Sequence, residues 1–354
     1  MLDQFDDIVV LDNEFQQPDG WRPDPLCLCV HWLRSGETRF YWRDKLRQMK
    51  RAPFDTSRRT LVVAFFASAE MSCFLELGWK RPQSLICLHA ENRAAYNGIL
   101  PFIKGQYGLL NACARRGIAT MPGQDKADRI KLITSKSSWT PEELALIEQY
   151  CREDVAVTTT LFSRMALAGE IDWPYALLRG RYTHAVAVME RNGVPINAEL
   201  LEHIIDRWDA MKFALIRAID EDYGVYEGRH FRQKLFAQYL EREQIPWPLT
   251  PTGRLTLEND TFRDQARLFP KLEPLRELRS TLDELKLGKL AVGPDGRNRC
   301  LLSPFGAQSG RNTPSNQKFV FGPAKWIRHL IKPPEGHGVA YTQLTREPEN
   351  LRDR

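Results

Sequence analysis

The first 154 residues of the chain contain three separated groups of acidic residues that together could bind metal ions. Asp12 and Glu14 lie near the start, and Glu70 follows an apolar run. Asp154 lies four residues after Tyr150. Acids from distant parts of a chain are needed to surround two divalent cations, because no single helix or strand can do so. The pattern predicts a carboxylate cage with a tyrosine at its edge, which favours metal-assisted hydrolysis of phosphodiesters.

Asp12 and Glu14 follow a run of apolar residues that predicts a buried strand. Residues i and i+2 of a strand point to the same face, so both carboxylates would project together. Burying two like charges side by side is costly unless cations neutralise them. The alternative is that the strand ends before Asp12 and that both acids are solvated in a turn.

Tyr150 and Asp154 share one face of a predicted helix, because residues four apart lie one above the other. A phenol beside a carboxylate can orient a water molecule for in-line attack on phosphorus. A solvated helix face is the alternative for this pair. Glu70 is predicted at the start of another helix, where the helix dipole favours an acid with or without a metal.

Strand and helix patterns divide the chain into two parts. Predicted strands cover residues 7–11, 25–33, 38–42, 60–66 and 84–89. Thr140, Pro141 and Glu143 form a capping box with proline at the first helical position, which predicts a helix over residues 141–165. Strands followed by helices favour a mixed α/β domain that ends near residue 165.

The later part of the chain is predicted to be mainly helical. The expected helices span residues 175–192, 198–223, 229–244, 259–268 and 272–290. The stretch 296–332 then contains seven Lys and Arg residues, no Asp or Glu, and interleaved aromatic residues. Cations neutralise phosphates and aromatic rings pack on bases, so this stretch predicts contact with nucleic acid. A solvated basic loop is the alternative.

Composition narrows the class of protein but does not identify a partner. The chain has 354 residues, a net charge of +5 and seven cysteines. An odd number of scattered cysteines, without a C-x-x-C pair, favours a reduced, cytoplasmic setting. The acidic first twelve residues do not fit a secretory signal, and no apolar stretch is long enough to predict a membrane span.

The order of the acidic motifs resembles the 3′–5′ proofreading exonuclease domain of family A (polymerase I-like) DNA polymerases. The first family motif, D-x-E, corresponds to Asp12 and Glu14, and the third, Y-x-x-x-D, to Tyr150 and Asp154. The second, usually N-x-x-x-D, corresponds to residues 66–70. Here phenylalanine replaces the asparagine and glutamate replaces the aspartate. The resemblance implies an RNase H-like, mixed-sheet α/β domain over residues 1–165.

The resemblance continues beyond the acidic motifs. Residues 182–196 are similar to the segment that opens the polymerase region, and the helices over 166–295 resemble the thumb. Residues 306–316 resemble the T-G-R segment that enters the palm, so 296–343 would be an incomplete palm. Residues 344–354 are polar and are predicted to be a disordered tail.

The resemblance also implies the ions, the substrate and the roles of individual residues. Two Mg²⁺ or Mn²⁺ ions would be held by Asp12, Glu14, Glu70 and Asp154, with Asp12 bridging both. DNA, as a single-stranded 3′ end or a primer–template, would be the partner in replication and repair. Arg311 would contact the primer–template, and the charge pattern adds Lys318, Lys325 and Arg328 as DNA-binding candidates.

No aspartate stands where the family has its first palm acid, so we expect no polymerase activity from this chain alone. Whether a separate chain supplies palm and fingers stays open. Two alternatives to an active exonuclease also stay open. One is a catalytically weakened DNA-binding remnant of such a polymerase, which the replacement of asparagine by Phe66 favours. The other is a stand-alone RNA-trimming exonuclease, which would have no use for thumb-like and palm-like segments.

Overall fold

The computed structural model describes residues 2–99, 105–284, 290–314, 318–321 and 325–333. These residues form two compact units. The first combines residues up to 193 with the segment 299–315, and the second combines residues 194–298 with the described residues after 315. The units do not coincide with the segments 1–165, 166–295 and 296–343, which stay predictions about functional domains. No helix in the described ranges is long and apolar enough to cross a membrane.

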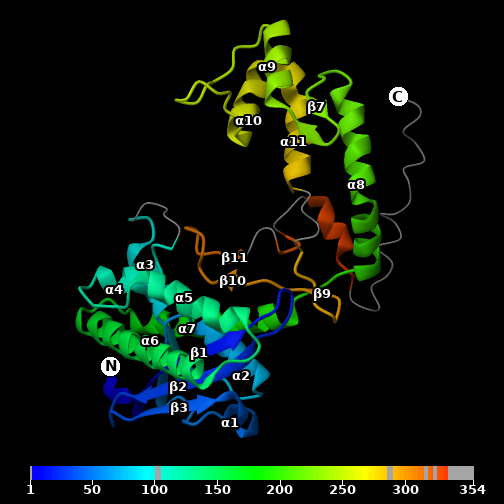
Figure 1. Cartoon of the computed structure of the whole chain (residues 1–354). Helices are drawn as coiled ribbons and strands as arrows, with labels where there is room; N and C mark the ends of the chain where they lie inside the picture. Colours follow the sequence, from blue (N-terminus) through cyan, green and yellow to red (C-terminus); the bar gives the residue numbers. More distant parts are fainter. Residues whose placement is uncertain (1, 100–104, 285–289, 315–317, 322–324, 334–354) are drawn as a thin grey trace. The chain divides into compact units, whose positions relative to one another are not determined.

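A five-stranded mixed sheet forms the centre of the first unit (Figure 1). Its strands are β1 (Asp7–Gln16), β2 (Asp24–Trp32), β3 (Thr38–Trp42), β4 (Thr60–Ala64) and β5 (Ser84–Cys87), in the order β3-β2-β1-β4-β5. Strand β1 pairs antiparallel with β2 and parallel with β4. The strands predicted from apolar runs are therefore present, and the coarse α/β class is confirmed.

Strand β1 continues five residues beyond its predicted end at Leu11. Asp12 pairs with Cys29 and Glu14 pairs with Cys27, and the register shifts only between Glu14 and Phe15. The acids therefore lie within the sheet. The alternative interpretation, which placed them in a turn, is wrong. The apolar pattern ends at Leu11, but the backbone of the following residues, which include Asp12 and Glu14, still pairs with β2.

Helices cover both faces of the sheet. The helices of this unit are α1 (Arg43–Gln48), α2 (Ala67–Glu76), α3 (Leu88–Tyr96), α4 (Leu109–Ala114), α5 (Gly123–Ser135), α6 (Pro141–Leu167) and α7 (Trp173–Asn192). Val10 on β1 packs in one core with residues of α4, α5 and α6, which Figure 1 shows together beside the sheet. Val9 and Leu11 point the other way, into a core that contains Met71 and Phe74 of α2.

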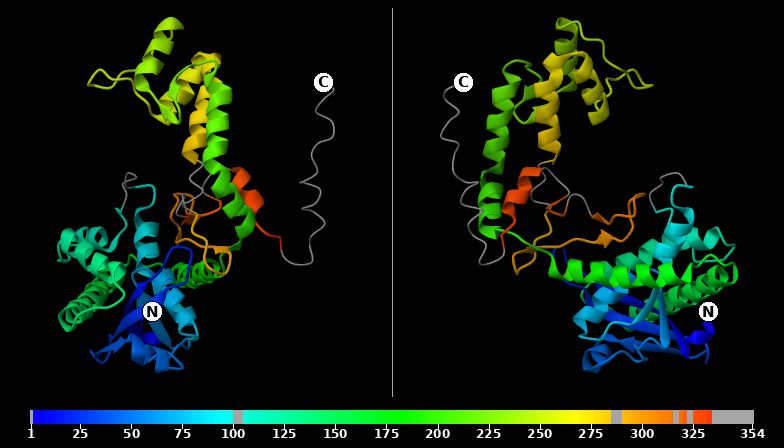
Figure 2. Two further views of the ribbon diagram at one scale, coloured as in Figure 1. Left: turned by 45° about the vertical axis from the view of Figure 1, so that its right-hand side comes forward. Right: turned by 180° about the vertical axis from the view of Figure 1, so that it is seen from behind.

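Two of these helices show how local sequence sets their ends and their packing. The predicted capping box begins α6, since the Thr140 hydroxyl accepts from Glu143 N–H and the Glu143 carboxylate accepts from Thr140 N–H. Helix α7, visible from behind in Figure 2, passes the edge strand β5. A Cβ atom at Gly180 would lie 1.8 Å from the carbonyl oxygen of Leu85, so only glycine permits this approach.

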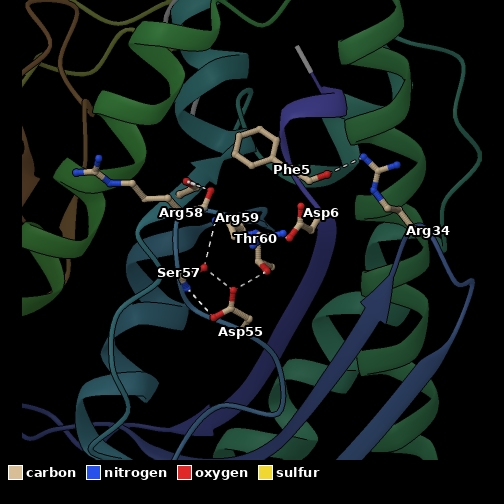
Figure 3. Close-up of polar contacts among 9 residues, drawn as sticks. Phe5, Asp6, Arg34, Asp55, Ser57, Arg58, Arg59 and Thr60 are labelled. Carbon is tan, nitrogen blue, oxygen red and sulfur yellow. Dashed lines mark hydrogen bonds and ion pairs between the residues drawn. The ribbon is translucent and has the colours of Figure 1, made fainter.

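The start of β1 is fixed by polar contacts at the end of the strand away from the acids (Figure 3). Arg34 donates to the carbonyl oxygen of Phe5 at 2.7 Å. Asp6 forms an ion pair with Arg59, and its backbone N–H donates to the Arg59 carbonyl at 2.8 Å. A short 3₁₀ turn, Leu2–Gln4, precedes the strand. These contacts hold the first residues of β1 in register with β4.

The second unit is mainly helical, as predicted for this part of the chain. Its helices are α8 (Ala198–Asp220), α9 (Gln233–Arg242), α10 (Asn259–Leu268) and α11 (Glu273–Glu284), with 3₁₀ turns at Pro270–Leu272 and Lys325–Leu330. Phe236, Phe262 and Leu275 are buried at the centre of one core. The expected helix at 229–244 begins later, because β7 (Tyr226–Glu227) and β8 (His230–Phe231) form a tight hairpin there.

Short pairings connect segments that are distant in the sequence. In the second unit β6 (Val194–Pro195) pairs with β9 (Arg297–Asn298). In the first unit β10 (Leu302–Ser303) pairs with β11 (Thr313–Pro314). The segment that carries β10 and β11 is attached to α7, since Leu302 N–H donates to Glu190 at 2.6 Å. This attachment explains why residues 299–315 belong to the first unit.

Candidate active site

Strand β1 and helix α6 bring the predicted acids of the first and third groups onto one side of the sheet. Asp12 and Glu14 project toward the face where Val10 packs, as the i, i+2 spacing predicted. Helix α6 contacts β1 on this face and carries Tyr150 and Asp154. The strand is central in the sheet, so its side chains are held in a fixed register.

Asp12 and Glu14 form a compact group of possible metal ligands together with a thiol. One ligand atom each from Asp12, Glu14 and Cys151 all lie within 4.8 Å of one another. The Sγ atom of Cys151 lies 3.4 Å from the Asp12 backbone oxygen and 3.8 Å from Asp12 Oδ2. Sequence reasoning missed Cys151, because a cysteine at this place in a helix is not distinguishable from a packing residue.

The pKa values of both carboxyl groups are raised, because too little positive charge lies nearby to stabilise their ionised forms. Burial, with the negative charge of Asp154, raises the pKa of Asp12 from 3.8 to about 8. Burial and the neighbouring Asp12 also raise the pKa of Glu14 well above its usual value. A cation between the two carboxylates would reverse both effects, since opposite charge favours the ionised form.

Glu70 reaches the same region from the opposite face of the sheet. It lies in the first turn of α2, is 3% exposed, and accepts a hydrogen bond from Asn13 Nδ2 at 2.5 Å. Burial and the charge of Asp12 raise its pKa well above the usual value, so the two carboxyl groups interact. Glu70 is nevertheless not part of the group whose ligand atoms lie within 4.8 Å.

Asp154 has an internal cation as its partner. Lys126, on α5, places its Nζ atom 2.6 Å from Asp154 Oδ2 and 5.1 Å from the centroid of the Tyr150 ring. Burial, together with Asp154, raises the pKa of Tyr150, so its hydroxyl keeps its proton. Nothing in the sequence indicated Lys126, because it precedes its partner by 28 residues on a different helix.

Buried thiols lie under the acidic group. Cys27, Cys29 and Cys151 are fully buried, as expected for cysteines that pack as small apolar groups, and all three are free thiols. Burial raises the pKa of Cys151 well above its usual value, with Cys27 and Cys29 adding to the effect. The Cys151 thiol is therefore protonated unless a metal ion binds it.

Phe66, which stands where the resembled family has asparagine, precedes the first turn of α2. It provides no side-chain cap to the helix, and its ring lies 5.0 Å from the ring of His89. Burial, with Arg93 nearby, lowers the pKa of His89 to about 4, so this imidazole is neutral at pH 7. The position offers an aromatic edge in place of an amide.

The four DNA-binding candidates are divided between the two units. Arg311 is exposed in the first unit. Lys318, Lys325 and Arg328 belong to the second unit, where the Arg328 guanidinium lies 5.6 Å from the centroid of the Phe321 ring. Their contact with DNA stays a prediction.

Comparisons with known proteins give a likeness of fold. No family model matches the chain, and no curated protein matches it. A solved structure described as the POL domain of Pol1 from M. smegmatis, in complex with DNA primer-template and dNTP, matches with a TM-score of 0.58. The sequences are 16% identical, and the match covers 93% of this chain and 55% of the other. This chain therefore spans about half the length of that polymerase structure.

Proposed function

We propose that the chain is a metal-dependent 3′–5′ exonuclease that acts on DNA. The observation that carries this proposal is the placement of Asp12 and Glu14 inside the central strand. Both face helix α6, and their electrostatic interactions extend to Asp154 and Glu70. A folded protein has no structural need for four interacting acids in one region, with Glu70 buried and the others partly buried, because each raises the cost of ionising the others.

The donor atoms fit a divalent cation with a preference for oxygen. Asp12 and Glu14 would hold Mg²⁺ or Mn²⁺, which carboxylates bind well. When bound, such an ion activates water and stabilises charge on the leaving oxygen. Water would attack the terminal phosphodiester, the 3′ oxygen of the preceding sugar would leave, and a nucleoside 5′-monophosphate would be released.

The side chains around the acids have separate roles in this proposal. Asp154 accepts a hydrogen bond from the attacking water and orients it. Tyr150, protonated and on the same face of α6, donates to an oxygen of the scissile phosphate. Glu70, held by Asn13, has a raised pKa, and a cation bound near Asp12 would favour its ionised form and gain a further negative charge beside the site.

DNA as the substrate class is supported by the likeness to a polymerase structure that contains a primer-template. It is also supported by the stretch 296–332, which contains no acids and, apart from the buried Arg299, six cations. A DNA-binding remnant that no longer cleaves is the second candidate. The aromatic edge of Phe66, where the resembled family has an amide, favours it.

Hydrolysis of matched oligonucleotides tests the proposal. A 5′-labelled single-stranded DNA should be shortened from its 3′ end in Mg²⁺ or Mn²⁺ and remain intact in chelator. RNA of the same sequence should be degraded more slowly. Binding of DNA without any shortening in either metal would favour the remnant, and faster degradation of RNA would favour an RNA-trimming enzyme.

A further inference from the structure

We propose that Lys126 takes the place of one of the two metal ions, so that the site binds a single divalent ion at Asp12 and Glu14. This inference rests on the proposed function, because it concerns the same acids. It differs from the sequence-based expectation of two ions. The ε-ammonium group of Lys126 supplies the positive charge at Asp154. The divalent ion, which is taken up from solution, supplies it at Asp12 and Glu14.

The contact between Lys126 and Asp154 leaves little room for a metal at the same oxygen. Nζ lies 2.6 Å from Oδ2, and the side chains are 18% and 13% exposed. A pair this close and this shielded is screened less by water than a surface ion pair. The face of Tyr150 gives the ammonium a second favourable contact, at 5.1 Å from the ring centroid.

The backbone around Lys126 is fixed by packing. Helix α5 contacts β1 and α6, and its residue Ile133 is 2% exposed. Gln16, at the end of β1, donates to the Ile133 carbonyl at 2.7 Å. The helix that carries Lys126 is therefore attached to the strand that carries Asp12 and Glu14. This attachment positions the ammonium group beside the acids.

Glu70 is less available to bind a metal than Asp12 and Glu14 are. Glu70 is engaged by the Asn13 amide and lies outside the close group. Asp12 and Glu14, with the thiol of Cys151, offer ligand atoms within 4.8 Å of one another. Ligands around one ion lie about 3–4 Å apart, since metal–ligand distances are roughly 2.0–2.3 Å. The arrangement thus suits one ion and one ammonium.

Counting bound Mn²⁺ ions tests this inference without any use of activity. Isothermal titration of the full chain with Mn²⁺ should give one site in the wild type. Lys126→Met removes the charge and keeps the length of the side chain, so it should add a second site at Asp154. Lys131→Met, an exposed lysine on the same helix, is the matched control and should keep one site. Lys126→Arg, which restores a cation, should also keep one.

The outcomes separate this inference from the proposed function. Two Mn²⁺ ions in the wild type would overturn the role of Lys126, whether or not the variants fold, and leave the nuclease proposal standing. One ion in both the wild type and a folded Lys126→Met would also overturn it. No bound Mn²⁺ in any of these proteins would overturn the metal site itself, and the proposed function with it.

Discussion

The pKa of Asp12 depends on its burial and on several neighbouring groups of the candidate site. This residue lies in the central strand, touches Cys151, and interacts with Asp154, Lys126 and Glu14. The burial of Asp12 and the charge of Asp154 oppose its ionisation, so this arrangement of acids lowers the stability of the protein when no cation is bound. A bound cation would relieve this repulsion, and the free energy released would add to the affinity for the metal.

Replacing Asp12 by Asn should stabilise the metal-free protein and abolish nuclease activity. Its pKa of about 8 in the folded state, against 3.8, corresponds to an upper limit of about 5–6 kcal/mol at pH 8 and above. We expect a smaller gain, since the asparagine amide must be accommodated. Thermal melting in chelator measures it, and a large loss of stability would show that Asp12 is structural.

Glu190, on α7, should make stability depend on pH. Burial raises its pKa from 4.5 to about 7. The folded state therefore keeps this proton up to about pH 7, while the unfolded chain loses it near pH 4.5. Stability should fall as pH rises through that window, by at most about 3–4 kcal/mol. Asp12, Glu14 and Glu70 act with the same sign, so Glu190→Gln should make the fall in stability between about pH 4 and 8 smaller without removing it. An unchanged slope would contradict this.

The sequence predicts some of these side-chain positions and not others. Asp12 and Glu14 could be paired, because i, i+2 spacing on a strand fixes their common face. The sequence does not predict that Lys126 and Cys151 lie near the acids, since their contacts depend on how α5 and α6 pack against β1. Side chains brought together by tertiary packing leave no local spacing to detect.

Helix α7 and strand β5 approach each other at the glycine that the packing requires. Gly180→Ala should destabilise the chain by about 1–3 kcal/mol, because its Cβ would overlap the Leu85 backbone. Gly123→Ala is the matched control at the start of α5, where the nearest atom to a Cβ is 3.7 Å away. The control should be neutral or slightly stabilising. Equal denaturation midpoints for the two variants would contradict the close approach.

Strands and long helices were predictable where local signals agreed. Apolar runs marked the five strands of the sheet, and Thr140, Pro141 and Glu143 marked the start of α6. The extension of β1 was not predictable from hydrophobicity, because Asp12 and Glu14 interrupt the apolar pattern. The hairpin at residues 226–231 was also missed, since it depends on a tight turn at Gly228, which has φ of +60°.

The chain as a whole combines an acidic site in the first unit with basic residues in both units. Replacing Lys318, Lys325 and Arg328 by alanine should weaken DNA binding for all sequences alike. For every phosphate that is no longer neutralised, the log–log salt slope should fall by roughly 0.7 on single strands and 0.9 on duplex. Fluorescence anisotropy across a salt series measures the slope. An unchanged slope would show that these charges only solvate the surface.

The division into units was the least predictable feature of the chain. Residues 299–315 return to the first unit through hydrogen bonds to residues more than 100 positions earlier, as between Leu302 and Glu190 or Gly306 and Arg93. Such long-range pairs have no periodicity in the sequence. The resemblance of motifs, by contrast, anticipated a likeness to a polymerase fold, which the match at 16% identity supports at the level of fold.

Release of mononucleotides from the 3′ end of DNA tests the central claim most directly. Purified wild-type chain and Asp12→Asn should be compared on a 3′-labelled single strand in Mn²⁺, after equal DNA binding is verified by anisotropy. We predict that the wild type releases labelled nucleoside monophosphate and that the folded Asp12→Asn variant does not. Equal release by both proteins, or no metal-dependent release by the wild type, would contradict the assignment of these acids to a nuclease site.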